Sequence, residues 1–142
     1  KPAWEASEFT DSMTDEKIRL LKLRSDNATL FDFPYNQAGG SYLTITFRKK
    51  GGELDAYMVI DKGQMLCGVR ECDFSVRIGD GDVQTWSGAR STTNDSDVIF
   101  VMEPRVLEQV VRQQIPFRIG IDFYQAGTRA FEFSPADYPG FD

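Results

Sequence analysis

The sequence predicts a mainly β protein, an antiparallel β-sandwich or partly open barrel of about eight strands with one helix at about residues 103–114. Apolar and polar residues alternate over several stretches of strand length, and glycine-rich turns separate these stretches at hairpin spacing. With 142 residues and 41% hydrophobic content, the chain can bury one core, and no repeat or linker divides it. We therefore expect a single β-rich domain over residues 1–142.

The first third of the chain is only partly regular. Residues 1–15 are polar, and Ser12-Met13-Thr14-Asp15 has the form of a helix-start box, although the residues that follow contradict a helix. Residues 17–24 alternate imperfectly and predict the first strand. Residues 29–33 predict a short apolar continuation that Pro34 ends.

The strongest local pattern predicts a hairpin over residues 42–61. Two alternating segments flank the glycine pair Gly51-Gly52, which supplies the positive φ angles of a tight turn. One buried face should collect the apolar residues of both strands. They are Leu43, Ile45, Phe47, Leu54, Ala56 and Met58.

The remainder predicts two more hairpins around a helix. The second hairpin covers residues 72–86 with its turn at 79–82, residues 87–97 read as a loop, and residues 98–102 form a short strand. Glu103-Pro104 opens the helix, and Pro116 stops it. The third hairpin covers residues 117–133. The apolar stripe of the helix is Val106, Leu107, Val110 and Val111.

Charge restricts the partners. Sixteen Lys and Arg against 22 Asp and Glu give a net charge of −6, which disfavours nucleic acid and anionic lipid. The partner we expect is a protein, and the long-range field favours a basic one, although mild acidity is also a common route to solubility. No stretch approaches the ~20 apolar residues of a membrane span.

Cys67 and Cys72 are the only cysteines and lie five positions apart. A thiolate zinc site would need two further ligands from carboxylates, and a redox motif would need two intervening residues. The open readings are a structural disulfide, which places the chain in an oxidising compartment such as the periplasm, or two reduced thiols in a cytosolic protein. A start at Lys1 without Met is what signal-peptide removal, or trimming to omit one, would leave, and a lipid-bearing cysteine would precede Lys1.

The sequence favours no enzyme and no cofactor. Histidine is absent, which removes the commonest general base and metal ligand. The motifs of serine hydrolases and phosphate-binding loops are also missing. A pair of carboxylates could still serve a glycan hydrolase. The candidates are Glu71, Asp73, Asp80 and Asp82, which otherwise form a solvated acidic face.

Three residues are the best candidates for contacting a partner. Trp86 follows a turn, Arg77 lies on the outer face of the preceding strand, and Tyr35 lies in a glycine-rich loop. Trp, Tyr and Arg are the residues that most often anchor protein interfaces. The structural alternative is that Trp86 covers the end of the core and Arg77 pairs with Asp82.

One diffuse pattern resembles a known group. Its elements are Gly63 to Cys67, Cys72, Val76-Arg77, Asp80-Gly81, Trp4, Ser12 to Asp15, and Phe131-Glu132-Phe133. Over most of the chain this pattern resembles small exported bacterial proteins, periplasmic or lipid-anchored, and more distantly the type VI secretion-associated accessory family called VasI or TagO. The resemblance implies export, a β-rich fold and a disulfide, and it carries over no catalytic residue.

These observations lead to three functional hypotheses. The first is a non-enzymatic binding module of the bacterial cell envelope, such as a secretion accessory, an inhibitor or an immunity-type protein. The second is a structural subunit of an envelope assembly, and the third is a carboxylate-dependent glycan hydrolase. Fold alone does not decide between them.

Overall fold

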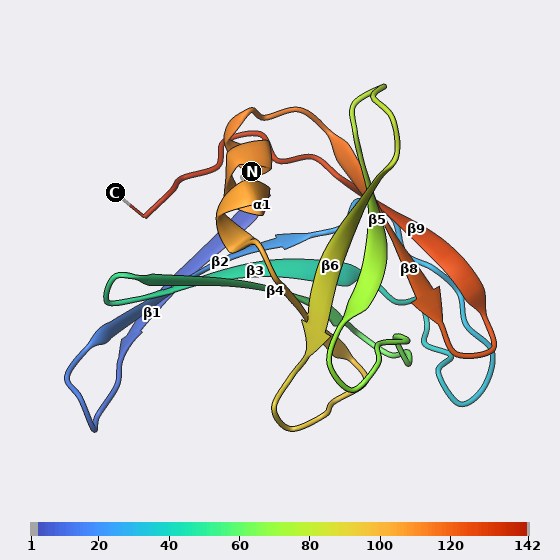
Figure 1. The fold of residues 1–142 in the computed structure, drawn as a ribbon, viewed down its shortest axis with the longest axis horizontal. Helices are drawn as coiled ribbons and strands as arrows, with labels where there is room; N and C mark the ends of the chain where they lie inside the picture. The colour runs from blue at the N-terminus through green and yellow to red at the C-terminus, as the bar shows by residue number, and fades with distance from the viewer. Residues whose placement is uncertain (1–2, 142) are drawn as a thin grey trace.

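The computed structural model describes residues 3–141, in which nine antiparallel strands form one sheet and one helix covers part of it (Figure 1). The elements are β1 (Trp4–Thr10), β2 (Lys17–Arg24), β3 (Leu43–Lys50), β4 (Glu53–Ile60), β5 (Cys72–Ile78), β6 (Gln84–Arg90), β7 (Val98–Val101), α1 (Pro104–Arg112), β8 (Phe117–Phe123) and β9 (Gly127–Phe133). Their order in the sheet is β1-β2-β3-β4-β7-β6-β5-β8-β9. The predicted fold class is confirmed, because the sheet is open and its edges are β1 and β9.

The sheet bends over on itself and encloses the core on its inner side. In Figure 1, β1 to β4 run across the view, whereas β5, β6, β8 and β9 cross them steeply. Alternate residues from both parts therefore point into one apolar interior. The largest fully buried side chains are the aromatic ones, Phe47, Phe117, Phe123, Phe131 and Phe133.

The N-terminal region differs from the prediction. Residues 4–10 form β1, which the sequence did not reveal because only Trp4 in this strand is buried and an edge strand shows little apolar alternation. Residues 12–15 lie in the turn to β2, where the Asp11 carboxylate accepts the backbone N–H of Met13 at 2.9 Å. The predicted strand at residues 17–24 is confirmed as β2.

The predicted apolar continuation at residues 29–33 is wrong. Only Thr29 pairs, in an isolated bridge with Ser41, while Leu30 and Phe33 are exposed. The guanidinium of Arg129 on β9 donates to Thr29 Oγ1 at 2.6 Å and to the Leu30 carbonyl at 2.8 Å. Long-range contacts with β9 therefore hold this segment as a loop along the sheet.

The hairpin at residues 42–61 is confirmed with its register. Ile45 faces Met58 and Phe47 faces Ala56 across β3 and β4, and all four are buried. Gly51 alone of the glycine pair has a positive φ, 58°. The third hairpin, β8 and β9, is confirmed as well.

The strand at the second hairpin is longer than predicted. β6 continues through residues 87–90, which the sequence assigned to a loop, so this part of the prediction is wrong. Gly88 belongs to the ladder on both sides, opposite Cys72 on β5 and Val101 on β7. A small residue is needed there because the Ile99 side chain lies where a Cβ on Gly88 would stand.

The helix α1 packs on the sheet beside β4. Leu107, Val110 and Val111 are buried as the stripe predicted, whereas Val106 is 42% exposed and lies outside the core. In Figure 1, α1 lies above β3 and β4 and to the left of β6. Within residues 3–141, no helix has the length and apolar character needed to cross a membrane.

Candidate functional site

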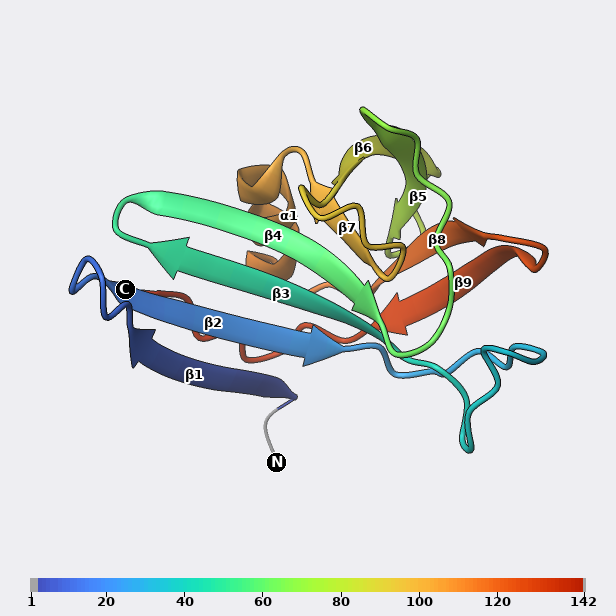
Figure 2. The ribbon, with the colours of Figure 1, turned by 90° about the horizontal axis from the view of Figure 1, so that it is seen from below.

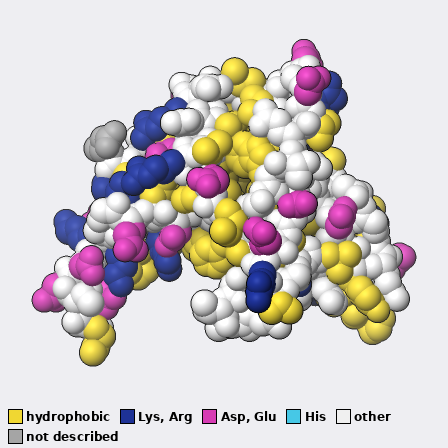
Figure 3. Space-filling view, in the orientation of Figure 1, with side chains coloured by type: hydrophobic (Ala, Val, Ile, Leu, Met, Phe, Trp, Pro, Cys, Tyr) yellow, Lys and Arg dark blue, Asp and Glu magenta, His cyan; other side chains and the backbone are white. Residues whose placement is uncertain are grey.

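A shallow groove of about 390 Å³ lies between β6 and the start of α1. Trp86 forms one wall, and Met102 and Val106 form the other, with exposed fractions of 50% and 42%. Figure 3 shows hydrophobic side chains gathered between α1 and β6 on this face. Glu71 and Glu103 also line the groove, and no basic residue of the described range 3–141 does so. We call this surface the Trp86 groove.

Trp86 is positioned by the core on one side and left open on the other. Its ring meets the buried Phe74 edge-on, with centroids 6.3 Å apart, and its indole N–H donates to Gln84 Oε1 at 3.0 Å. The sequence alternative in which Trp86 covers the core is therefore correct for one face of the ring. A rigid, half-buried indole with a polar edge is the type of side chain that anchors protein interfaces.

The disulfide loop supplies the acidic edge of the groove. Cys67 and Cys72 form the disulfide, and both side chains pack against the core. The loop between them carries Glu71 to the groove and presents Val69, which is 98% exposed. A ring of this size restricts the backbone on which Glu71 and Val69 stand.

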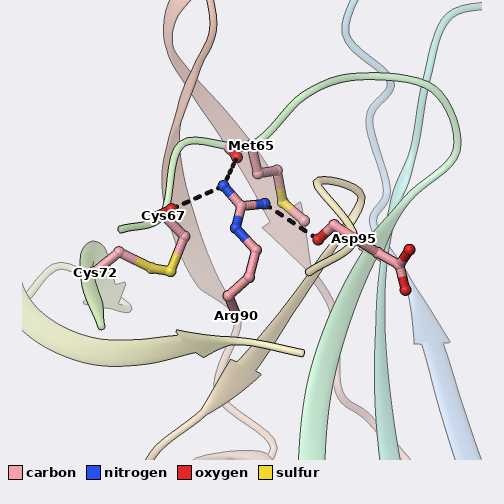
Figure 4. Close-up of a disulfide and its surroundings, with 5 residues drawn as sticks. All are labelled: Met65, Cys67, Cys72, Arg90 and Asp95. Atoms are coloured by element: carbon pink, nitrogen blue, oxygen red, sulfur yellow. Dashed lines mark hydrogen bonds between the residues drawn. A yellow bond between two sulfur atoms is a disulfide. The ribbon is translucent and has the colours of Figure 1, made fainter. Parts of the chain in front are cut away.

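Arg90 ties this loop to the end of β6 (Figure 4). One terminal guanidinium nitrogen donates to the carbonyls of Met65 and Cys67, at 3.2 Å and 2.8 Å. The other donates to the Asp95 carbonyl at 3.1 Å. Because the guanidinium is a fixed fork of donors, it fixes the disulfide loop and the 91–97 loop relative to each other.

The other two predicted contact residues lie away from the Trp86 groove. Arg77 donates through Nε to the Gly81 carbonyl at 2.9 Å, so it stabilises its own hairpin turn rather than pairing with Asp82 as the alternative supposed. Tyr35 is half-buried, and its hydroxyl donates to Gln64 Oε1 at 2.9 Å. The structure thus brings neither residue into the surface that Trp86 forms.

The four carboxylates considered for glycan hydrolysis do not line one common groove. Glu71 lines the Trp86 groove, and Asp80 lines another, together with Asp26 and Glu132. In that second groove, Asp26 accepts the Ser134 hydroxyl at 2.6 Å, and Glu132 pairs with Arg118 at 3.4 Å. Across residues 3–141, no three acidic or cysteine side chains gather in a cluster that could hold a metal ion.

Sequence reasoning missed Met102 and Val106 as surface residues. Met102 ended a predicted strand, and Val106 began the apolar stripe of the helix, which was expected to pack on a sheet. The only signal that could have distinguished Val106 is its place at the edge of the stripe, one turn before the buried Val110.

Comparison with protein-family models, with curated proteins and with solved structures finds no match for this chain.

Proposed function

We propose that this chain is a non-enzymatic binding module of the bacterial cell envelope that holds a protein partner in the Trp86 groove. The observation that carries the proposal is the groove itself. In it, the side chains of Trp86, Met102 and Val106 lie beside the carboxylates of Glu71 and Glu103. Apolar anchors with a charged rim are the usual anatomy of a protein-binding patch.

The charge of the groove indicates the kind of partner. Among the residues that the structure describes, its charged lining residues are Glu71 and Glu103, and the chain carries a net charge of −6. A partner surface with one apolar side chain surrounded by Lys or Arg would bury that side chain against Trp86 and place its cations near both acids. Neither acid has to leave water to meet such a rim, because both are exposed.

The intramolecular disulfide supports the envelope location. Disulfides persist in oxidising compartments and are rare in the reducing cytosol. The resemblance to exported bacterial proteins agrees with this location, and among the hypotheses raised by the sequence a secretion accessory, an inhibitor or an immunity-type protein fits a binding surface of this form.

The test is partner capture from envelope extract, followed by affinity measurement with the purified partner. Trp86→Ala should cost about 2 kcal/mol or more, which is roughly a 30-fold rise in Kd. Tyr124→Ala is the matched control, because Tyr124 is a 50% exposed aromatic outside the groove. Equal affinity of wild type and Trp86→Ala would refute the proposed surface.

Two variants of opposite charge at Met102 test whether the partner is basic. Met102→Lys and Met102→Glu both remove the apolar contact, at a side chain that is half exposed. If the partner is basic, Met102→Lys should bind more weakly than Met102→Glu, and the difference should shrink at high salt. Equal weakening by both variants would leave only the apolar part of the proposal standing.

A further inference from the structure

The two edge strands of the sheet, β9 and β1, differ in whether another segment pairs with their outer side. Along β9, the loop that follows β2 occupies the outer edge: Asp26 N–H donates to the Glu132 carbonyl at 2.7 Å, and Asn27 Oδ1 accepts the Glu132 N–H at 2.7 Å. The Asn27 amide also donates to the Ala130 carbonyl at 3.0 Å. This edge is therefore closed by side-chain and backbone pairing.

The outer edge of β1 has no such cover. Within residues 3–141, the backbone of residues 4–10 pairs with β2 and with no other segment. Figure 2 shows β1 as the outermost strand, with no other strand along its outer side. β1 contains no proline, and its register with β2 runs without a bulge. Proline, bulges and charged side chains usually prevent an edge strand from pairing with another chain, and of these β1 has only the charges of Glu5 and Glu8.

The register identifies which backbone groups point outward. Asp11 N–H donates to the Glu16 carbonyl directly opposite, at 2.8 Å, so this is a hydrogen-bonded pair. In an antiparallel ladder such pairs alternate with pairs that are not bonded to each other. Continuing the register from Asp11 along β1 places the N–H and C=O groups of Ala6 and Glu8 on the side away from β2.

Open grooves border β1 on both faces of the sheet. One of about 930 Å³ is lined by Glu5, Lys22, Thr46 and Tyr57, which share one face by register. The other, of about 290 Å³, is lined among others by Ala6, Glu8, Arg19 and Phe141, and Ala6, Glu8 and Arg19 share the opposite face. A strand added beside β1 would send alternate side chains toward these two grooves.

We propose that the open edge of β1 accepts an extended, basic segment of a protein partner as an additional strand. The acids of β1 determine the chemistry of the segment, because they lie one strand nearer to an added strand than Lys22 and Arg19, which stand opposite them on β2. Glu5 and Glu8 lie three residues apart and so point to opposite faces. Glu8 also pairs with Lys17 at 3.7 Å, but both side chains are at least half exposed, so this weak pair leaves the carboxylate accessible. A segment with one Lys or Arg on each face, three residues apart, places a cation opposite each acid. A second copy of β1 fits less well, because it brings two further carboxylates to the same edge.

The surface is separate from the Trp86 groove, since none of the residues lining that groove belongs to β1 or β2. The proposal therefore goes beyond the proposed function and does not depend on it.

The probe for the test is a synthetic peptide of the length of β1, with blocked ends, two lysines three residues apart and threonine or valine elsewhere. Two control peptides carry the lysines two residues apart, on one face, or glutamates in place of the lysines. We expect the first peptide to bind at least tenfold more tightly than either control. In its complex, hydrogen exchange at the Ala6 and Glu8 amides should slow by at least tenfold, while that of the β9 amides stays unchanged.

Ala6→Pro tests the backbone contact. Proline removes the outward N–H and leaves the β1–β2 hydrogen bonds in place, as edge strands allow. Peptide affinity should fall at least tenfold. If this variant does not fold, Glu8→Lys changes an exposed side chain and should weaken the same peptide by a comparable factor. Trp86→Ala should bind the peptide like wild type, which separates the two surfaces.

Three results would overturn the proposal. They are peptide binding that is absent or independent of lysine spacing, unchanged exchange at Ala6 and Glu8 in the complex, and dimerisation of the chain alone that Ala6→Pro abolishes. The last result would make a second copy the occupant of the edge.

Discussion

Gly88→Ala should destabilise the fold although it adds only one methyl group. The new Cβ would stand 2.5 Å from Ile99 Cγ2, 3.1 Å from the Phe100 carbonyl oxygen and 3.4 Å from Phe74 Cε1. Ile99 is 1% exposed, and Gly88 lies in the middle of the sheet between β5 and β7, so neither side can move away freely.

Two effects of opposite sign determine how much Gly88→Ala changes the free energy of unfolding. Overpacking a rigid core costs about 1–3 kcal/mol. Replacing Gly by Ala restricts the unfolded chain and returns about 0.4–1 kcal/mol. The expected net loss is about 1–2 kcal/mol, which for a 142-residue chain lowers Tm by about 3–6 °C.

Chemical and thermal unfolding of the purified protein measure this loss. Gly52→Ala is the matched control, because its Cβ would meet no atom within 4 Å. Only the effect on the unfolded chain then remains, so this variant should be as stable as wild type or up to about 1 kcal/mol more stable. A double-mutant cycle with Ile99→Ala identifies the cause: removing Cγ2 should make the two costs non-additive by about 1 kcal/mol. Wild-type stability of Gly88→Ala, or strict additivity in the cycle, would refute the steric argument.

Three further predictions concern the disulfide and two titrating groups. Replacing Cys67 and Cys72 together by Ser should lower the free energy of unfolding by about 2 kcal/mol, because the ring spans a sequence separation of only five; urea unfolding measures this, and no change would contradict the loop-entropy estimate. The Met13 N–H and then Lys50 hold the pKa of Asp11 below its usual value, so Asp11 stabilises the fold above that value and the contribution disappears as pH falls through the lowered pKa. Asp11→Asn should remove this part of the acid dependence in pH-dependent melting, and an unchanged acid limb would contradict it. Burial raises the pKa of Tyr57, so stability should fall as pH rises past the usual tyrosine value, and Tyr57→Phe should reduce this alkaline loss, whereas equal alkaline melting of both proteins would speak against it.

The alternating segments could be predicted because their apolar residues mark the buried face of the strand and their polar residues mark the exposed face. The β3–β4 hairpin follows from this rule, since Ile45, Phe47 and Met58 are buried while their neighbours are not. A one-residue slip would have turned every one of these side chains to the other face, so the register was fixed as well. The Gly-Gly and Asp-Gly turns marked the reversals from β3 to β4 and from β5 to β6.

Two of the errors in strand assignment, the missed β1 and the shortened β6, have one physical cause. β1 is an edge strand with six exposed residues, and β6 ends in Ser87-Gly88-Ala89-Arg90, whose small and polar residues are typical of loops. Both segments are strands because neighbouring strands satisfy their backbone hydrogen bonds, and that pairing is not encoded in the segment itself. Composition therefore gave the wrong answer where the tertiary environment decides.

The candidate site shows the same division. From residue type and spacing, the sequence predicted a contact role for Trp86 and favoured a disulfide between Cys67 and Cys72. The structure contains the disulfide and places Trp86 in a groove. The sequence could not show that α1 would leave Val106 beside Trp86, nor that Arg77 and Tyr35 would be used in contacts within the chain.

By itself, then, the sequence determined the fold class, three hairpins, the helix and the acidic charge, since these depend on local periodicity and composition. Only the tertiary structure decided which strands become neighbours, and with them which sheet edge stays open and which apolar side chains remain on the surface. The physical reason is that an edge or a groove arises between segments distant in the chain, where burial depends on what the rest of the molecule fails to cover.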